Sequence, residues 1–172
     1  MFGPRTVWDN GRAMLIRVDD GDRVLGRATK RACHSGRGLR HRAFLVMLFN
    51  ARGELLLARR HASKWLWPGW WDGTVAGHVE AGETYASAAR RRVFEEMRVR
   101  PRLTRTDKFP YTARWKKDGE NEICAIFTGR VETVTPHPKE IDALRWSKSP
   151  KGRLVPWLRI ALERRNAGPT VE

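Results

Sequence analysis

Apolar residues along the chain gather in short runs that turn residues separate, a pattern that predicts a sheet of several strands. The longest run, residues 43–50, is continuous and typical of a buried strand. Asn50 and Gly53 follow it, so we expect a turn and a hairpin partner strand over residues 54–59. Further strands are expected over residues 14–18, 23–26, 74–76, 103–113, 122–131 and 141–146.

Helical spacing of apolar residues occurs near the middle and at the end of the chain. Glu83 is expected to open the central helix, whose apolar face carries Ala86, Ala89, Val93 and Met97. Residues 155–165 predict a terminal amphipathic helix and residues 28–33 a short one. We see no repeat or linker, so we expect a loose lead-in over residues 1–13. A single α+β domain over residues 14–172 would follow, with a mixed β-sheet flanked by helices.

The composition is that of an ordinary globular protein, and 172 residues suffice for one domain with a core. The two cysteines, Cys33 and Cys124, provide no disulfide framework, which favours a reducing compartment. We find no signal-peptide core near the first residues and no apolar run approaching the ~20 residues of a membrane span. We therefore expect a cytoplasmic protein without a membrane partner, as a monomer or weak dimer.

The net charge of +15, from 34 basic and 19 acidic residues, suggests a nucleic-acid-binding protein without catalysis as one hypothesis. The basic residues are scattered, however, and a positive surface equally suits a phosphorylated small molecule. Tryptophans that could stack on bases more often pack a core or line an apolar pocket. Five of the eight surround the central segment: Trp65, Trp67, Trp70, Trp71 and Trp115. We expect no nucleic-acid partner.

Residues 73–99 carry a loop–helix motif with glutamates suited to a hard cation that holds diphosphate oxygens. The segment resembles the Nudix signature, with matches at Gly77, Glu83, Arg91, Glu95 and Glu96. It departs at Arg92, where that signature has glutamate, and at Arg98, where it has glycine. A surface helix with solvated charges is the alternative interpretation. The joint match of glycine and carboxylates favours the motif.

Three histidines and a second acidic pair form another candidate constellation. His34 and His41 flank a glycine-bearing loop, and His78 lies in the loop before the central helix. Glu120 and Glu122 are two residues apart and face the same side if a strand begins at Glu120. Three imidazoles and two carboxylates suit a divalent ion such as Zn²⁺ or Mn²⁺. A lone histidine is more often a packing or surface residue, so the set carries little weight without a family pattern.

Long phrases of the chain resemble the type I isopentenyl-diphosphate delta-isomerases, a family with the Nudix fold. The resemblance runs from about Val18 to the terminal helix. The matching phrases include HRAF from His41, LFNARGELLLARR, SKWLWPGWWD, GHVEAGE, ENEIC from Glu120 and VPWL. The family interconverts isopentenyl and dimethylallyl diphosphate by adding and removing protons. The resemblance therefore implies an isomerase of isoprenoid biosynthesis that acts on a prenyl diphosphate.

The same resemblance implies two metal sites and a set of phosphate contacts. One divalent ion, Mn²⁺ or Zn²⁺, would be held by His34, His41, His78, Glu120 and Glu122. Glu96 would hold the Mg²⁺ that bridges the substrate diphosphate. The phosphates would be contacted by Lys30, Arg60, Lys64 and Arg92. Arginine and lysine suit this task because they form charge-assisted hydrogen bonds to phosphate oxygens.

The resemblance also implies the residues that handle the proton and the cation. Glu122 would transfer the proton, with Tyr111 beside it. Trp157 would face the carbocation, since an aromatic face attracts a cation by about 2 kcal/mol or more when desolvated. Arg92 stands where a pyrophosphate hydrolase has a metal-binding glutamate, which argues for holding the diphosphate intact.

Ala76 is the main departure, because the isomerase family has a catalytic cysteine at this position. Alanine cannot transfer a proton, and neither Cys33 nor Cys124 fits the role. Three interpretations remain open. In the first, the alanine is an engineered knockout. In the second, it is natural, and another group or water takes over the role of the cysteine. In the third, the protein is a natural relative that protonates an alkene, and the resulting cation is captured internally. The small side chain would also give room for a longer prenyl chain.

The leading hypothesis is therefore an isomerase-like enzyme that protonates a prenyl diphosphate at Glu122 with the help of a metal. A protonation-initiated terpene cyclase on the same scaffold is the first alternative. A Nudix pyrophosphohydrolase is the second, favoured by Glu83, Glu95 and Glu96 but opposed by Arg92 and the three histidines.

Overall fold

A computed structural model of the chain describes residues 13–167. The elements are β1 (Met14–Val18), β2 (Val24–Thr29), α1 (Lys30–His34), β3 (His41–Phe49), β4 (Leu55–Arg60), β5 (Trp71–Asp72), β6 (Val75–His78), α2 (Tyr85–Met97), β7 (Thr104–Trp115), β8 (Asp118–Arg130), β9 (Ile141–Ser147) and α3 (Pro156–Asn166). All described strands belong to one mixed sheet, so the α+β prediction is confirmed. The predicted lead-in lies outside the described residues except at Ala13, and the domain boundary at residue 14 stays a prediction.

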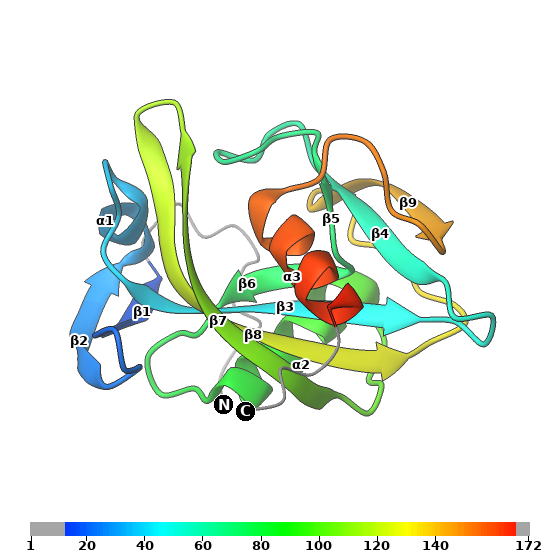
Figure 1. Cartoon of the computed structure of the whole chain (residues 1–172), viewed down its shortest axis with the longest axis horizontal. Helices are drawn as coiled ribbons and strands as arrows, with labels where there is room; N and C mark the ends of the chain where they lie inside the picture. The colour runs from blue at the N-terminus through cyan, green and yellow to red at the C-terminus, as the bar shows by residue number, and fades with distance from the viewer. Residues whose placement is uncertain (1–12, 168–172) are drawn as a thin grey trace.

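Strand β3 lies at the centre of the sheet. It pairs in parallel with β8, from His41 opposite Glu122 onward, and antiparallel with β6, from Ala43 opposite His78. Helix α3 covers the front of this sheet and α2 lies behind it (Figure 1). The continuous apolar run of β3 is therefore buried on both faces, as its sequence predicted.

The alternation of side chains along β3 divides the core into two layers. Phe44, Val46 and Leu48 pack with the apolar face of α2. Leu45 and Met47 face the other way, toward α3 and the tryptophan-rich segment, residues 65–71. Because successive side chains in a strand point to opposite faces, one strand supports both layers.

Helix α2 begins after Glu83, not at it. Thr84 is the N-cap, and its side chain and that of Ser87 form a reciprocal capping box. Glu83 instead accepts hydrogen bonds from the amide of Glu80 at 3.0 Å and from Arg91 Nη2 at 2.9 Å. The glutamate that sequence reasoning assigned to the first turn therefore ties the preceding loop to the helix.

The predicted hairpin of residues 43–50 and 54–59 forms only at its turn. Strands β3 and β4 share a single pair, Phe49 with Leu55, and β4 then pairs along its length with β9. The two edges of β3 are already taken by β8 and β6, so β4 has to diverge. The Thr74 hydroxyl bridges the gap, since it accepts from the Leu48 amide and donates to the Leu56 carbonyl, both at 2.8 Å.

Smaller boundary differences have local causes. The strand expected over residues 23–26 runs from Val24 to Thr29, and the short helix follows at Lys30–His34 because the Thr29 hydroxyl caps it. The strands expected over residues 103–113 and 122–131 extend toward each other, so that β7 ends at Trp115 and β8 begins at Asp118 instead of Glu122. The earlier start keeps Glu120 and Glu122 within one strand, as their shared face requires.

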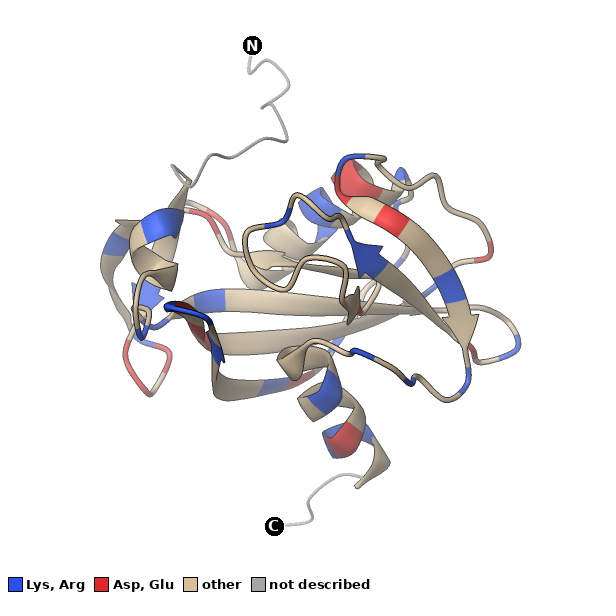
Figure 2. Cartoon of the chain, turned by 90° about the horizontal axis from the view of Figure 1, so that it is seen from above, with Lys and Arg blue, Asp and Glu red and all other residues tan. Residues whose placement is uncertain are grey.

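Charged residues are spread over the fold. Lys and Arg occur on helices, strands and loops (Figure 2), in line with their scatter along the sequence. Among the described residues, no helix is both long and apolar enough to cross a membrane.

The bridge at Thr74 should carry measurable stability. Thr74→Val keeps the shape but leaves the buried Leu48 amide and Leu56 carbonyl without this partner, so we expect a loss of about 1–3 kcal/mol in the free energy of unfolding. Urea denaturation measures this free energy of unfolding. Thr104→Val, on an exposed strand position, is the matched control and should change stability by less than about 0.5 kcal/mol. Equal stability of the two variants would contradict this role for the hydroxyl.

Candidate active site

A cavity of about 430 Å³ opens between the sheet, α1, the tryptophan-rich segment and α3. The predicted site residues that line it are Lys30, His34, Arg60, Lys64, Ala76, His78, Arg92, Tyr111, Glu120, Glu122 and Trp157. Two predicted residues do not line it. His41 is fully buried behind Glu122, and Glu96 lines a smaller neighbouring cavity. The fold thus collects almost the whole predicted set around one space.

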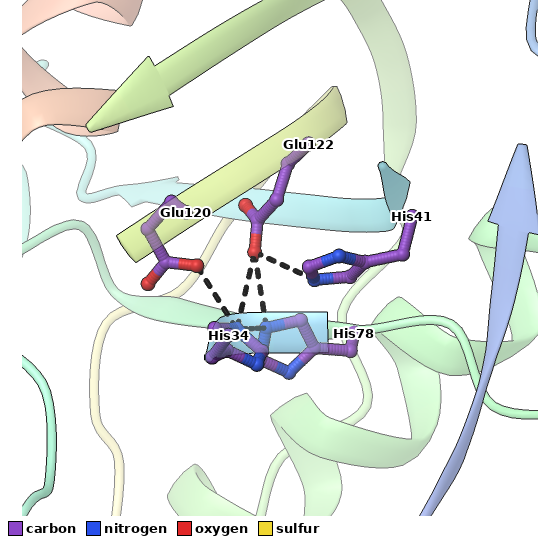
Figure 3. Close-up of side chains that lie close together, drawn as sticks. All are labelled: His34, His41, His78, Glu120 and Glu122. Carbon is purple, nitrogen blue, oxygen red and sulfur yellow. Dashed lines mark hydrogen bonds and ion pairs between the residues drawn. The ribbon is translucent and has the colours of Figure 1, made fainter. Parts of the chain in front are cut away.

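Five side chains converge at one end of the cavity (Figure 3). One ligand atom from each of His34, His41, His78, Glu120 and Glu122 lies within 4.8 Å of every other. The register of the sheet explains the convergence, because His41 on β3 is paired with Glu122 on β8 and His78 ends the neighbouring strand β6. His34, the last residue of α1, completes the set.

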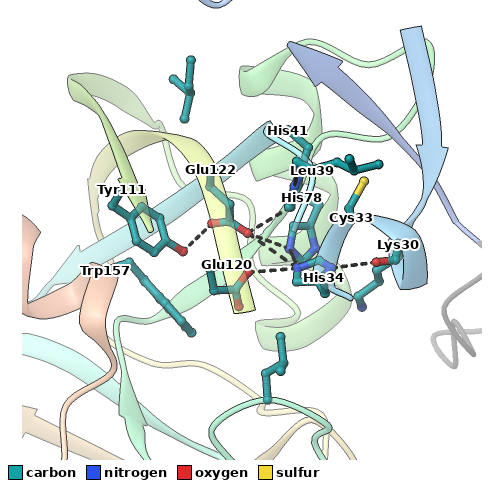
Figure 4. Close-up of polar contacts among 12 residues, drawn as sticks. Lys30, Cys33, His34, Leu39, His41, His78, Tyr111, Glu120, Glu122 and Trp157 are labelled. Atoms are coloured by element: carbon teal, nitrogen blue, oxygen red, sulfur yellow. Dashed lines mark hydrogen bonds and ion pairs between the residues drawn. The ribbon is translucent and has the colours of Figure 1, made fainter. Parts of the chain in front are cut away.

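Backbone contacts orient two of the imidazoles. His34 Nδ1 lies 2.7 Å from the Lys30 carbonyl oxygen, and His41 Nδ1 lies 2.7 Å from that of Leu39 (Figure 4). A carbonyl accepts only, so each Nδ1 carries the proton and each Nε2 is left with a lone pair. Both Nε2 atoms therefore reach the centre of the cluster as potential metal ligands.

The centre of the cluster is crowded with acceptors. The Nε2 atoms of His34 and His78 are 3.1 Å apart, and those of His41 and His78 each lie 3.1 Å from Glu122 Oε1. Glu120 Oε2 is buried without a well-oriented hydrogen bond, although it lies 2.9 Å from His34 Nε2. Lone pairs that converge in this way require protons or a cation between them. The donor set of nitrogen and carboxylate oxygen fits a divalent transition-type ion.

Without a metal, the five side chains strongly perturb one another's ionisation. Burial and repulsion from Glu122 raise the pKa of Glu120 to about 7. Burial opposes protonation of His34, but the two carboxylates outweigh it and raise its pKa to about 10. Burial lowers the pKa of His78 well below its usual value. A bound cation would take the place of the protons that the cluster otherwise has to retain.

Glu122 faces both the cluster and the cavity. Its Oε1 lies against the histidines, whereas its Oε2 accepts a short hydrogen bond from the Tyr111 hydroxyl (Figure 4). Burial opposes its ionisation, but the three histidines prevail and hold the pKa of Glu122 well below its usual range. Burial and the Glu122 charge raise the pKa of Tyr111, which keeps the phenol protonated. The pair is arranged to hold and move a proton at Oε2.

Ala76 lines both the large cavity and the smaller one, where its neighbours include charged residues. Ala76 packs with the aromatic layer that includes Trp157, whose ring centroid lies 5.3 Å from that of Trp67 and 6.2 Å from that of Tyr111. Cys124 also lines the cavity, but its thiol is buried and burial raises its pKa well above the usual value. Burial likewise raises the pKa of Cys33 to about 11, and this thiol lies outside the cavity wall.

Cationic side chains also line the cavity, and two of them are paired with carboxylates, of which only Glu140 was not named from the sequence. Arg92 contacts Glu95 at 2.9 Å, forms a short bond to Glu96, and lies 3.5 Å from Glu140. Lys64 also bonds to Glu140, which is buried. Glu140 belongs to no motif in the sequence, and only the packing of its loop against α2 brings it to this site.

Further lining residues were also missed by sequence reasoning. They include Arg31, Glu80, Arg91 and Lys139. Asp72 is the last residue of the phrase SKWLWPGWWD and was given no role in the site, yet it ends β5 as a buried carboxylate hydrogen-bonded to Arg60 and Trp157. An acidic residue after paired tryptophans carries no pattern that would distinguish a buried partner from a solvated loop residue.

The chain is similar to known proteins in family, sequence and fold. The NUDIX domain family matches residues 39–154. The chain is 37% identical over 173 residues to a protein of Haloarcula marismortui named isopentenyl-diphosphate delta-isomerase, covering 91% of this chain and 92% of that one. It is 38% identical over 146 residues to the protein of the same name from Burkholderia multivorans, covering 84% and 81%.

Solved structures show the same fold at lower sequence identity. A protein from Deinococcus radiodurans superposes with a TM-score of 0.65 at 24% identity, covering 92% of each chain. The MutT protein of Methanosarcina mazei superposes with a TM-score of 0.62 at 22% identity, covering 76% of this chain and 96% of the other. Together with the family match, these structures confirm the predicted Nudix fold.

The five-residue cluster should bind a divalent transition metal. We expect about one Zn²⁺ or Mn²⁺ per chain after metal loading and desalting, measured by elemental analysis. Glu120→Gln removes a ligand charge and should weaken binding at least about tenfold. Glu163→Gln, an exposed position on α3, is the control and should bind as the unmodified protein does. Equal metal retention by both variants would remove Glu120 from the site.

Proposed function

The chain belongs to the Nudix proteins and, within them, to the type I isopentenyl-diphosphate isomerase family. We propose that it protonates the alkene of a prenyl diphosphate with the help of a metal. The enzyme class is therefore that of an isomerase. One observation carries the proposal, which is that Glu122 directs one oxygen into the five-residue cluster and shares the other with Tyr111 at the cavity. A proton on that second oxygen, Oε2, would lie at the cavity in which we propose that the substrate binds.

The cationic side chains of the cavity are suited to the diphosphate group. Lys30, Arg60, Lys64 and Arg92 line the cavity, and we propose that all four contact the phosphates. Arg92 and Lys64 are held by carboxylates of α2 and of the segment before β9, so their positions are set before substrate arrives. Such preorganisation lowers the entropic cost of binding. Glu96, which would hold Mg²⁺, lines the small adjoining cavity together with Arg60 and Lys64, so the ion would add positive charge beside two of the proposed phosphate contacts.

The proposed reaction begins with proton transfer to the terminal alkene carbon. The proton comes from the Glu122–Tyr111 pair, the π electrons form the new C–H bond, and the adjacent tertiary carbon becomes a cation. An ion of Mn²⁺ or Zn²⁺ in the cluster would supply the charge that makes Glu122 a stronger acid. Trp157, on the cavity wall, presents an aromatic face to the cation. Loss of a proton from the neighbouring carbon then yields the isomer.

The second proton transfer is where this chain departs from its family. Ala76 stands on the wall where the family has cysteine and offers no ionisable group. An isomerase outcome therefore requires water or another group as the second proton carrier. The aromatic layer against which Ala76 packs also favours an alternative, in which the cation is captured by a second double bond of a longer prenyl chain, as in a terpene cyclase.

A Nudix pyrophosphohydrolase is the less favoured alternative. Glu95 and Glu96 could hold metal, but Arg92 forms ion pairs with both carboxylates. A guanidinium in this place supplies a fixed positive charge where a hydrolase needs a third carboxylate. The arrangement supports binding of the diphosphate rather than its cleavage.

Deuterium uptake tests the proposed protonation. In D₂O with isopentenyl diphosphate and metal, we expect slow uptake by the unmodified chain, detected by NMR of the products. Ala76→Cys should raise the rate by roughly 10²–10⁴-fold because it restores an acid–base group. Glu122→Gln should abolish uptake in both backgrounds. Absence of uptake by both the unmodified chain and Ala76→Cys would refute the isomerase function, whereas cyclic products from longer prenyl diphosphates would favour the cyclase.

The role of Arg92 can be separated from general charge effects. Arg92→Glu removes charge-assisted hydrogen bonds of about 1.5–3 kcal/mol and should raise the KM for prenyl diphosphate by roughly 10–100-fold. Arg90→Glu makes the same charge change at an exposed position of α2 and should leave KM within about twofold. Release of phosphate or pyrophosphate from a panel of nucleoside diphosphate compounds by the unmodified chain would instead support the hydrolase.

A further inference from the structure

Asp72 lies directly behind the cavity wall and joins two of its residues. It is 4% exposed, and it lines the small neighbouring cavity rather than the large one. Its Oδ1 accepts a hydrogen bond from Trp157 Nε1 at 2.7 Å and from the Gly73 amide at 2.8 Å. Its Oδ2 accepts from Arg60 Nη1 at 3.1 Å. Burial raises the pKa of Asp72 above its usual value, whereas the charge of Arg60 and the three donated hydrogen bonds act in the opposite direction and favour the ionised carboxylate.

The two residues that Asp72 joins also interact with each other. The guanidinium carbon of Arg60 lies 5.5 Å from the ring centroid of Trp157. Arg60 is held in addition by the Leu66 carbonyl, at 3.1 Å from Nε and 2.9 Å from Nη2. A cation so close to the indole would oppose a second cation on the cavity side of the same ring. The negative charge of Asp72 offsets it.

We propose that Asp72 is a positioning residue, which fixes Trp157 and Arg60 together and places a negative charge at the N–H edge of the indole, so that the ring attracts a cation more strongly. The inference rests on the proposed function, in which a carbocation forms beside Trp157. A carboxylate that accepts the indole N–H increases the electron density of the ring and attracts the cation through space. The effect is absent while the alkene of the substrate is uncharged and appears as positive charge develops on its carbon, so it acts on the transition state.

The binding of a carbocation mimic tests this role without turnover. The probes are a tertiary ammonium diphosphate with the carbon skeleton of isopentenyl diphosphate, isopentenyl diphosphate itself, and inorganic pyrophosphate, each measured by calorimetry. The unmodified chain should bind the ammonium compound at least about tenfold more tightly than the neutral one. Asp72→Asn keeps the shape of the side chain but removes its charge. It should lose most of this preference, which is a ratio between two prenyl diphosphates and is therefore unaffected by any change of Arg60 at the diphosphate, whereas the affinity for pyrophosphate reports that change separately.

The indole N–H resonances provide a second, activity-independent readout. Asp72→Asn should shift the Trp157 indole proton upfield, because an amide is a weaker acceptor than a carboxylate. Asp118→Asn is the matched control, since Asp118 accepts from Trp65 Nε1 at 3.0 Å in the same manner. That variant should shift the Trp65 resonance alone and keep the preference for the ammonium compound.

The outcomes separate this inference from the proposed function. If the unmodified chain binds the ammonium compound no more tightly than the neutral one, the carbocation mechanism fails, and the role of Asp72 fails with it. If the unmodified chain shows the preference and folded Asp72→Asn retains it, only the assignment of Asp72 is overturned. Should Asp72→Asn not fold, Trp157→Phe removes the indole N–H but keeps a ring, and full retention of the preference would overturn the inference equally.

Discussion

The pairing of β3 with β8 on one side and β6 on the other is the constraint on which the rest of the structure depends. It places His41, Glu122 and His78 in adjacent positions of one sheet, and α1 brings His34 over them. The same pairing uses both edges of β3, so β4 diverges from it and pairs with β9. The site is thus built on strands, whose hydrogen bonds hold the ligand atoms more rigidly than loops would.

The site combines two kinds of electrostatic environment. In one, carboxylates and imidazoles converge in a buried cluster that requires protons or a metal. In the other, Arg92 and Lys64 are paired with Glu96 and Glu140. In this helix an arginine takes a position where the Nudix signature has a metal-binding glutamate. This pairing is consistent with the proposal that the chain holds a diphosphate without cleaving it.

The proposed proton-transfer groups, Glu122 and Tyr111, are hydrogen-bonded to each other, while Ala76 packs against the aromatic layer. Asp72 is a buried carboxylate hydrogen-bonded to Trp157 of that layer. This arrangement suits the proposed reaction, in which protonation by the pair is followed by stabilisation of a cation by the aromatic layer, whether a second proton transfer or an internal capture completes it.

The sequence by itself determined the fold class, the buried central strand, the central helix and a set of site residues most of which line the cavity. It did so because apolar periodicity and the family phrases are local properties of the chain. It assigned Glu83 to the helix and residues 43–59 to a full hairpin, and both were wrong, because a cap depends on side-chain geometry and a strand partner on which edges are free. Only the tertiary structure brought Glu140 and Asp72 to the site. Each is an isolated acidic residue whose burial and partners come from segments distant in the chain, so no local pattern marks them.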